Sequence, residues 1–235
     1  MDAIELLTHF NLTKQEATIY LTLVASGELT GYEAAKLTCT SRSNAYTALA
    51  GLVDKGAARV IEGTSTKYTP VTVKEFCTNR IRRMQGYRDE LLHQVSAQKG
   101  EPDGYITIKG SDHIIDKMKT MLDDARRRVY LSLSEDILRK VLPEIEGAVR
   151  RGLKVVLITN PPFELPGARV YHTAKNQPAI RLIADSGFVL TGDIAQGAGS
   201  TCLYSRKKNL VDLFKESMKN EIELIELTAE KAGKM

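Results

Sequence analysis

The 235-residue sequence predicts two domains, an α+β domain at the N-terminus and an α/β domain behind it. Two helix-capping patterns and a hairpin pattern fall within residues 1–72. A long helical segment with one apolar stripe follows over 73–100. Over 101–235, apolar extended runs alternate with helical patterns, as in a sheet covered by helices. These three segments are the expected domains and connecting helix.

Two capping boxes begin two of the N-terminal helices. In Thr13-x-x-Glu16, each side chain can bond an amide of the first helical turn that otherwise lacks a partner. Apolar residues then recur at helical spacing as far as Gly27, which is typical of a helix end. The same pattern, Thr30-x-x-Glu33, begins the next helix.

The next helix follows a short polar stretch over 38–41, which predicts a turn. Ser41 or Thr40 can cap this helix, which we expect to run to about Lys55. No acidic residue occurs between Ala34 and Val53. The apolar stripe that should face the core consists of Ala45, Leu49, Leu52 and Val53.

Two extended runs, 57–61 and 66–70, flank turn-forming residues and predict a β-hairpin. Helix, helix, turn, helix and hairpin, in that order, form a winged helix-turn-helix. In that fold, the second helix of the motif enters the major groove of DNA. The less favoured interpretation is a winged helix used only for protein contacts.

The outward face of the helix from Ser41 should therefore contact double-stranded DNA. Arg42 can bind a guanine edge or a phosphate, and cations on the hairpin can reach flanking phosphates. The predicted DNA-binding residues are Lys36, Ser41, Arg42, Ser43, Asn44, Tyr46, Thr47, Ala50, Arg59 and Lys67.

The charge distribution indicates weak binding by a single copy. The net charge is +4, but residues 1–70 carry six Lys/Arg against seven Asp/Glu, whereas 71–100 carry six against three. DNA affinity depends strongly on neutralised phosphates. We therefore expect two copies to act together.

The segment from Val73 to about Gln98 is expected to be the dimerisation or spacer helix. Its apolar positions are spaced almost as heptads, although Gly86 and Arg88 weaken the pattern. We expect a homodimer through 73–100, with the C-terminal domain as an additional contact. The stripe consists of Cys77, Ile81, Met84, Arg88, Leu91 and Val95.

The remaining elements alternate. The run LKVVLIT is nearly all apolar, as expected when both faces of a sheet are covered. Strands are expected at 105–109, 128–133, 153–159, 168–171, 180–184, 187–191 and 201–204. Helices are expected at 111–125, 136–151 and 207–228.

About residues 5–72 resemble the DNA-binding domain of TrmB-family regulators. The resemblance implies a sequence-specific regulator that dimerises through the helix after the wing. Its motifs are Leu12-Thr13-x-x-Glu16-Ala17-x-x-Tyr20, Ser41-Arg42-Ser43-x-x-Tyr46, Lys55-Gly56 and Tyr68-x-Pro70.

Roughly residues 103–230 resemble that family's C-terminal domain, a phospholipase D-like α/β sandwich. Phospholipase D chemistry needs His-x-Lys-x4-Asp, with the histidine as nucleophile. If Asp185 is the aspartate, the lysine and histidine positions hold Ile180 and Pro178. We therefore expect no catalytic residue and no enzyme.

Two other functions remain open. A phosphodiesterase-like enzyme could use the helix-turn-helix for targeting, with His172 as its nucleophile. A chromatin-architectural protein would bind DNA without sequence preference. Some family members bind sugars through an additional domain that this sequence is too short to include, so no sugar ligand is implied.

A ligand cleft is predicted where the strands of the α/β domain end, because ligands of open α/β sheets lie beyond the carboxyl ends of strands. The alternative is that Asn160-Pro161-Pro162 is a rigid turn and the domain only dimerises. The predicted ligand-binding residues are Ser132, Ser134, Thr159, Asn160 and Asp185.

Several classes of protein are excluded by composition. No run of about 18 apolar residues predicts a membrane span, and the N-terminus lacks the pattern of a signal peptide. Cys39, Cys77 and Cys202 are far apart, which argues against a metal site or a disulfide framework. We expect a cytoplasmic regulator with no cofactor and an unidentified small-molecule effector or partner.

Overall fold

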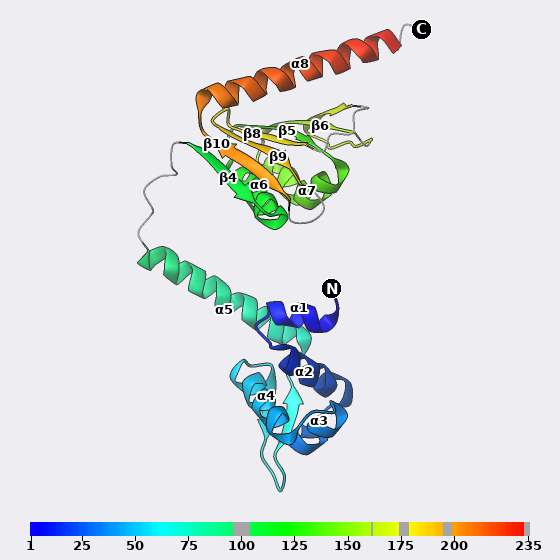
Figure 1. Ribbon diagram of the computed structural model, residues 1–235, viewed down its shortest axis with the longest axis vertical. Coiled ribbons are helices and arrows are strands. Elements are labelled where there is room, and N and C mark those ends of the chain that lie inside the picture. Colours follow the sequence, from blue (N-terminus) through cyan, green and yellow to red (C-terminus); the bar gives the residue numbers. More distant parts are fainter. Residues whose placement is uncertain (96–103, 161, 174–178, 195–198, 233–235) are drawn as a thin grey trace. The chain divides into compact units, whose positions relative to one another are not determined.

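The computed structural model divides into two compact units, residues 1–100 and 101–235. Each unit is described by itself (Figure 1). The residues that the structure describes are 1–95, 104–160, 162–173, 179–194 and 199–232.

Four helices form the body of the N-terminal unit, and both predicted capping boxes are present. The Thr13 amide donates to Glu16 Oε2 at 2.6 Å, and the Glu16 amide donates to Thr13 Oγ1 at 3.2 Å. Thr30 and Glu33 repeat this exchange. The helices are α1 (Ala3–His9), α2 (Lys14–Ser26), α3 (Gly31–Leu37) and α4 (Arg42–Asp54).

A three-stranded antiparallel sheet completes the winged helix-turn-helix. The predicted hairpin is β2 (Ala58–Ile61) and β3 (Lys67–Pro70), and β1 (Leu29–Thr30) pairs with the outer side of β3. The sequence did not predict β1 because two residues cannot show the alternation that marks a strand.

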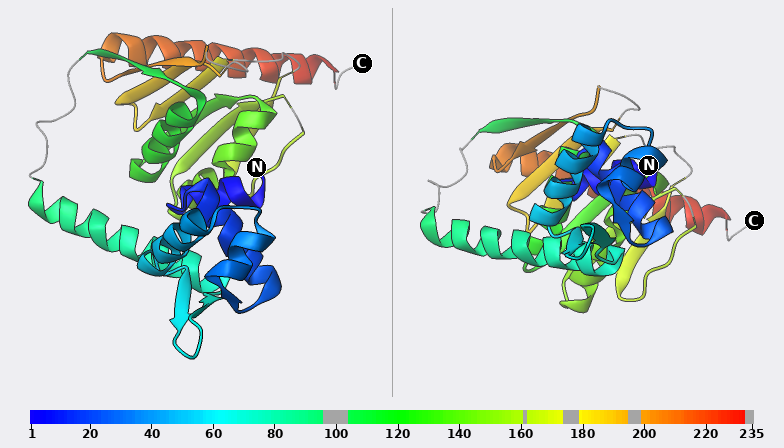
Figure 2. Two further views of the ribbon diagram at one scale, coloured as in Figure 1. Left: turned by 60° about the horizontal axis from the view of Figure 1, so that its bottom comes forward. Right: turned by 90° about the horizontal axis from the view of Figure 1, so that it is seen from below.

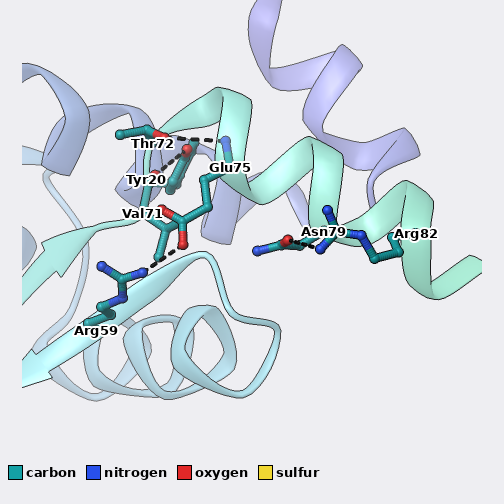
Figure 3. Close-up of polar contacts among 7 residues, drawn as sticks. All are labelled: Tyr20, Arg59, Val71, Thr72, Glu75, Asn79 and Arg82. Carbon is teal, nitrogen blue, oxygen red and sulfur yellow. Dashed lines mark hydrogen bonds and ion pairs between the residues drawn. The ribbon is translucent and has the colours of Figure 1, made fainter.

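The start of the long helix α5 (Val73–Gln94) is tied to the core of this unit. The hydroxyl of the buried Tyr20 donates to the carbonyl oxygen of Val71 at 2.7 Å (Figure 3). Burial raises the pKa of Tyr20 to about 12. Phe76 packs beside the same ring, with the ring centroids 5.8 Å apart.

The last turns of α5 extend away from α1–α4 (Figures 1 and 2). Every residue from Ile81 to Val95 is exposed. The helix ends at Gln94 and not at about Gln98 as predicted, because Val95 takes extended backbone angles, φ −93° and ψ 106°. Such angles suit its β-branched side chain.

A seven-stranded mixed sheet forms the centre of the C-terminal unit, in the order β4-β10-β9-β8-β5-β6-β7. The pairs β5–β6 and β6–β7 are parallel, and the others are antiparallel. The strands are β4 (Tyr105–Lys109), β5 (Arg128–Leu133), β6 (Lys154–Thr159), β7 (Ala168–His172), β8 (Ala179–Ala184), β9 (Phe188–Asp193) and β10 (Thr201–Ser205).

Helices cover both faces of this sheet (Figures 1 and 2). The helices α6 (Ser111–Asp124) and α7 (Glu135–Arg150) enclose the larger core on one face. The helix α8 (Lys208–Ala232) packs on the other face through residues such as Val211 and Met218. The unit is therefore an α/β sandwich, as expected from the sequence, and β6 is buried from both sides as its apolar run predicted.

Candidate nucleic-acid interface

One face of α4 is exposed and carries the side chains predicted to contact DNA, whereas the opposite face is buried. The buried face includes Ala45, Leu49 and Leu52. The helix begins at the predicted cap, since Ser41 Oγ accepts from the Asn44 amide at 3.2 Å. The exposed residues are Ser41, Arg42, Ser43, Asn44, Tyr46, Thr47 and Ala50.

Arg42 is stacked on a ring from the preceding helix. Its guanidinium carbon lies 4.5 Å from the ring centroid of Tyr32 in α3. A guanidinium that stacks through its flat face keeps its N–H donors in the plane, where they can bind a guanine edge or a phosphate. The sequence analysis missed Tyr32, because nothing in the local pattern shows that α3 and the start of α4 come together here.

Tyr46 lies against the first residue of α3. A Cβ atom at Gly31 would overlap the Tyr46 ring, so only glycine allows this approach. Gly31 is buried, while Tyr46 is half exposed. Contacts with α3 therefore fix the positions of both Arg42 and Tyr46 on α4.

The predicted cations outside α4 lie in different surroundings. Arg59 is directed at the start of α5, where its Nη2 atom lies 2.7 Å from Glu75 Oε1 (Figure 3). Lys67 Nζ is 3.8 Å from Glu28 Oε2, and both side chains are about half exposed. Lys36 is exposed on α3. The structure therefore does not gather Arg59 with the α4 face.

A partly buried ion pair joins α2 to the end of α4. Lys55 Nζ lies 2.6 Å from Glu16 Oε2, and a Cβ atom at Gly51 would overlap Glu16 Oε1. Burial opposes ionisation of Glu16, but the Lys55 ammonium and the bonds from Thr13 hold its pKa below the usual range. The Glu16 carboxylate thus caps α2 and also pairs with Lys55, the residue that follows α4.

The structure does not bring the predicted ligand residues of the C-terminal unit together. Leu133 pairs with Thr159 across β5 and β6, so Ser132 and Thr159 face opposite sides of the sheet. Ser132 Oγ accepts from Arg181 Nη2 at 2.9 Å, and Arg181 also pairs with Glu221 at 2.6 Å. Ser132 therefore helps to hold α8 on the sheet.

Ser134 and Asn160 directly follow β5 and β6, as predicted. Ser134 is the N-cap of α7 but makes no side-chain capping bond. Asn160 is exposed, whereas the hydroxyl of the buried Thr159 has no hydrogen-bond partner among the residues that the structure describes. These three side chains stay predictions as ligand contacts.

Asp185 lies in the turn between β8 and β9, at the other end of the strands from Thr159. Its carboxylate accepts three backbone N–H bonds at 2.8–3.0 Å, from residues 126, 127 and 128. Burial opposes its ionisation, but these bonds keep the pKa of Asp185 below its usual range. Asp185, which the sequence analysis aligned with the motif aspartate, thus has a structural role that needs neither a histidine nor a lysine.

The other two motif positions lack catalytic groups. Ile180 is buried in the core, and Pro178 lies outside the described residues. His172 is exposed on β7. Within the described ranges, no group of three or more His, Cys, Asp or Glu could hold a metal ion, and no helix is long and apolar enough to cross a membrane.

Two family models match the chain. The model "Sugar-specific transcriptional regulator TrmB" matches residues 6–74, and "Transcriptional regulator TrmB, EBD N-terminal subdomain" matches residues 104–211. The two matches coincide with the winged helix and with most of the sheet domain.

The individual relatives share only low sequence identity with this chain. The uncharacterized protein YrhO of Bacillus subtilis is 24% identical and covers 95% of this chain and 86% of its own length. The sugar-sensing transcriptional regulator TrmBL1 of Pyrococcus furiosus is 24% identical over 68% of this chain, which spans about half (48%) of TrmBL1. The solved structure of TrmBL2, described as an archaeal chromatin protein, covers 94% of this chain and 97% of its own at 24% identity, with a TM-score of 0.48.

Proposed function

Since the chain belongs to the TrmB family of transcriptional regulators, we propose that it acts as a homodimeric, sequence-specific DNA-binding regulator in the cytoplasm. The observation that carries the proposal is the exposed face of α4, which has no acidic residue before Asp54 and has Arg42 stacked at its N-terminal turn. This is the part of a helix-turn-helix that reads base edges in the major groove.

Pairing of two copies compensates for the weak attraction of a single copy for DNA. The N-terminal 70 residues carry one more acidic than basic residue, so one domain has little electrostatic attraction for DNA. The exposed α5 stripe includes Ile81, Met84 and Leu91. A groove of about 530 Å³ between the end of α1 and α5 adjoins this stripe. A second α5 would cover both, and the C-terminal domain would bind an effector or a partner.

The decisive experiment concerns Arg42. Genome-wide footprinting identifies the bound sites, and the binding of one such site and of random DNA is then measured for the wild type and for Arg42→Ala. We expect a loss of about 1–3 kcal/mol on the specific site and a much smaller loss on random DNA. Arg150→Ala, an exposed arginine in the other unit, is the matched control.

Two results would contradict the proposal. Equal losses on both DNAs would reduce Arg42 to a phosphate contact. Broad footprints without discrete peaks would favour the chromatin-architectural function. Neither outcome depends on knowing the effector.

A further inference from the structure

A pocket of about 310 Å³ opens between α6 and the end of the sheet where β8 and β10 finish and β9 begins. It lies at the opposite end of the sheet from Thr159 and Ile180, and Asp185, the residue aligned with the motif aspartate, is on its rim. Its volume is at the lower end for ligand sites, which suits a small metabolite. The residues that matter below are Lys117, Thr120, Asp124, Phe188, Tyr204 and Arg206.

Two aromatic rings form an apolar wall of this pocket. Phe188 and Tyr204 come from neighbouring parts of β9 and β10, and their ring centroids are 6.3 Å apart with an interplanar angle of 14°. Tyr204 is buried and Phe188 is half-buried against the same core. Met121 and Ala184 extend the wall. A ligand here would bury an apolar part.

A cation lies over each ring. Lys117 Nζ is 4.0 Å from the Tyr204 ring centroid, and the Arg206 guanidinium carbon is 5.1 Å from the Phe188 centroid. The Arg206 side chain makes no hydrogen bond or ion pair with any residue in the described part of the chain. Because a stacked guanidinium keeps its N–H edge available, Arg206 can still bind a carboxylate or phosphate through two donors.

Two carboxylates, Asp124 and Asp185, line the pocket beside these two cations. The Asp185 carboxylate on the rim already accepts three backbone N–H bonds. Asp124 is the other carboxylate in the lining, against Lys117 and Arg206. We propose that the pocket binds a small organic anion, whose carboxylate or phosphate pairs with Arg206 and Lys117 and whose apolar body lies on Phe188 and Tyr204. Binding is independent of the proposed function; only an effector role for the ligand rests on it.

The test uses the full-length chain without DNA, so that its failure is separate from a failure of the DNA-binding proposal. Phenyl phosphate and phenylacetate are titrated by calorimetry, with phenol and inorganic phosphate as probes that each lack one half of the chemistry. We expect saturable binding of at least one aromatic anion, about tenfold or more tighter than either partial probe. The two aromatic anions distinguish a phosphate ligand from a carboxylate ligand.

Three variants locate the site. Arg206→Gln removes the guanidinium, and Thr120→Phe fills the pocket while keeping both cations, since the Thr120 hydroxyl bonds only to its own helix. We expect each to weaken binding about tenfold, and Arg150→Gln, an exposed arginine on α7, to leave it unchanged. Circular dichroism confirms that the variants are folded. No saturable binding of either aromatic anion, equal binding of inorganic phosphate, or equal losses in Arg150→Gln would overturn the proposal.

Discussion

The ring of Tyr32 holds the side chain that the proposed function depends on most. Without it, the Arg42 guanidinium would sample many rotamers before binding, and stacking at an exposed site contributes about 0.5–1 kcal/mol. We expect Tyr32→Ala to weaken specific DNA binding about two- to fivefold with little change in thermal stability. Fluorescence anisotropy with labelled operator DNA measures the affinity.

Tyr32→Phe is the control for this prediction, because it keeps the ring face and removes only the hydroxyl. Its affinity should stay close to that of the wild type. If Tyr32→Phe lost as much as Tyr32→Ala, the hydroxyl itself would contact DNA and the stacking argument would be wrong.

Single residues show where sequence reasoning works and where it stops. The exposed positions of α4 followed from the helical period, because a helix that buries Ala45 and Leu49 must turn Thr47 outward. The structural role of Asp185 could not be predicted from the sequence, because the three backbone amides that donate to it lie nearly 60 residues earlier in the chain. The Arg59–Glu75 pair could likewise not be predicted, because it depends on the packing of α5 beside β2.

Two helical glycines should respond in opposite ways to the same substitution. Alanine is favoured over glycine in a helix by about 1 kcal/mol. Gly86→Ala should gain roughly that amount, because a Cβ atom there has nothing within 4 Å. Gly51→Ala should instead lose about 1–3 kcal/mol, because the new Cβ atom overlaps Glu16 Oε1 and disturbs its pair with Lys55.

Urea unfolding followed by circular dichroism measures both glycine variants. The comparison is informative because helix propensity alone predicts that both are stabilised. A stabilised Gly51→Ala would show that the contact between α2 and α4 is loose, and the recognition helix would then lack the anchor that we assign to Glu16.

The exposed stripe of α5 should be the dimer contact. Met84→Glu places a charge in the middle of that stripe and should shift the protein from dimer to monomer, as measured by analytical ultracentrifugation. Arg82→Glu changes charge on the same exposed helix outside the stripe and should leave the dimer intact. A dimer that survived Met84→Glu would move the contact elsewhere, most directly to the C-terminal unit.

The elements were predictable to the extent that their signals are local. The capping pairs at Thr13 and Thr30 and the hairpin before Pro70 act within a few residues, and each is present. The strand β1 and the end of α5 at Gln94 were missed. The first exists only because β3 lies beside it, and the second depends on the backbone angles of a single residue.

At the scale of the whole molecule, the order of the strands lay beyond the sequence pattern. Each of the seven strands was expected from its own apolar run, but β8 returns antiparallel beside β5, and β10 lies between β4 and β9. Which strands pair with one another depends on the packing of α6, α7 and α8 on the two faces of the sheet. The pocket beside Arg206 arises from that order and could not be read from the chain.

The dimer and the DNA site should share one two-fold symmetry. Two copies of α4 linked through α5 can engage one duplex together only if it carries two inverted half-sites, about 10–10.5 base pairs apart or a multiple of this. We therefore expect a single half-site to bind wild-type protein at least tenfold more weakly than the full site, and Met84→Glu to lose a similar factor on the full site. Both changes remove the same linkage, so the double change should lose little more than either alone. Fluorescence anisotropy on full-site and half-site duplexes measures all four affinities at one salt concentration. Fully additive losses would mean that α5 does not couple the two recognition helices.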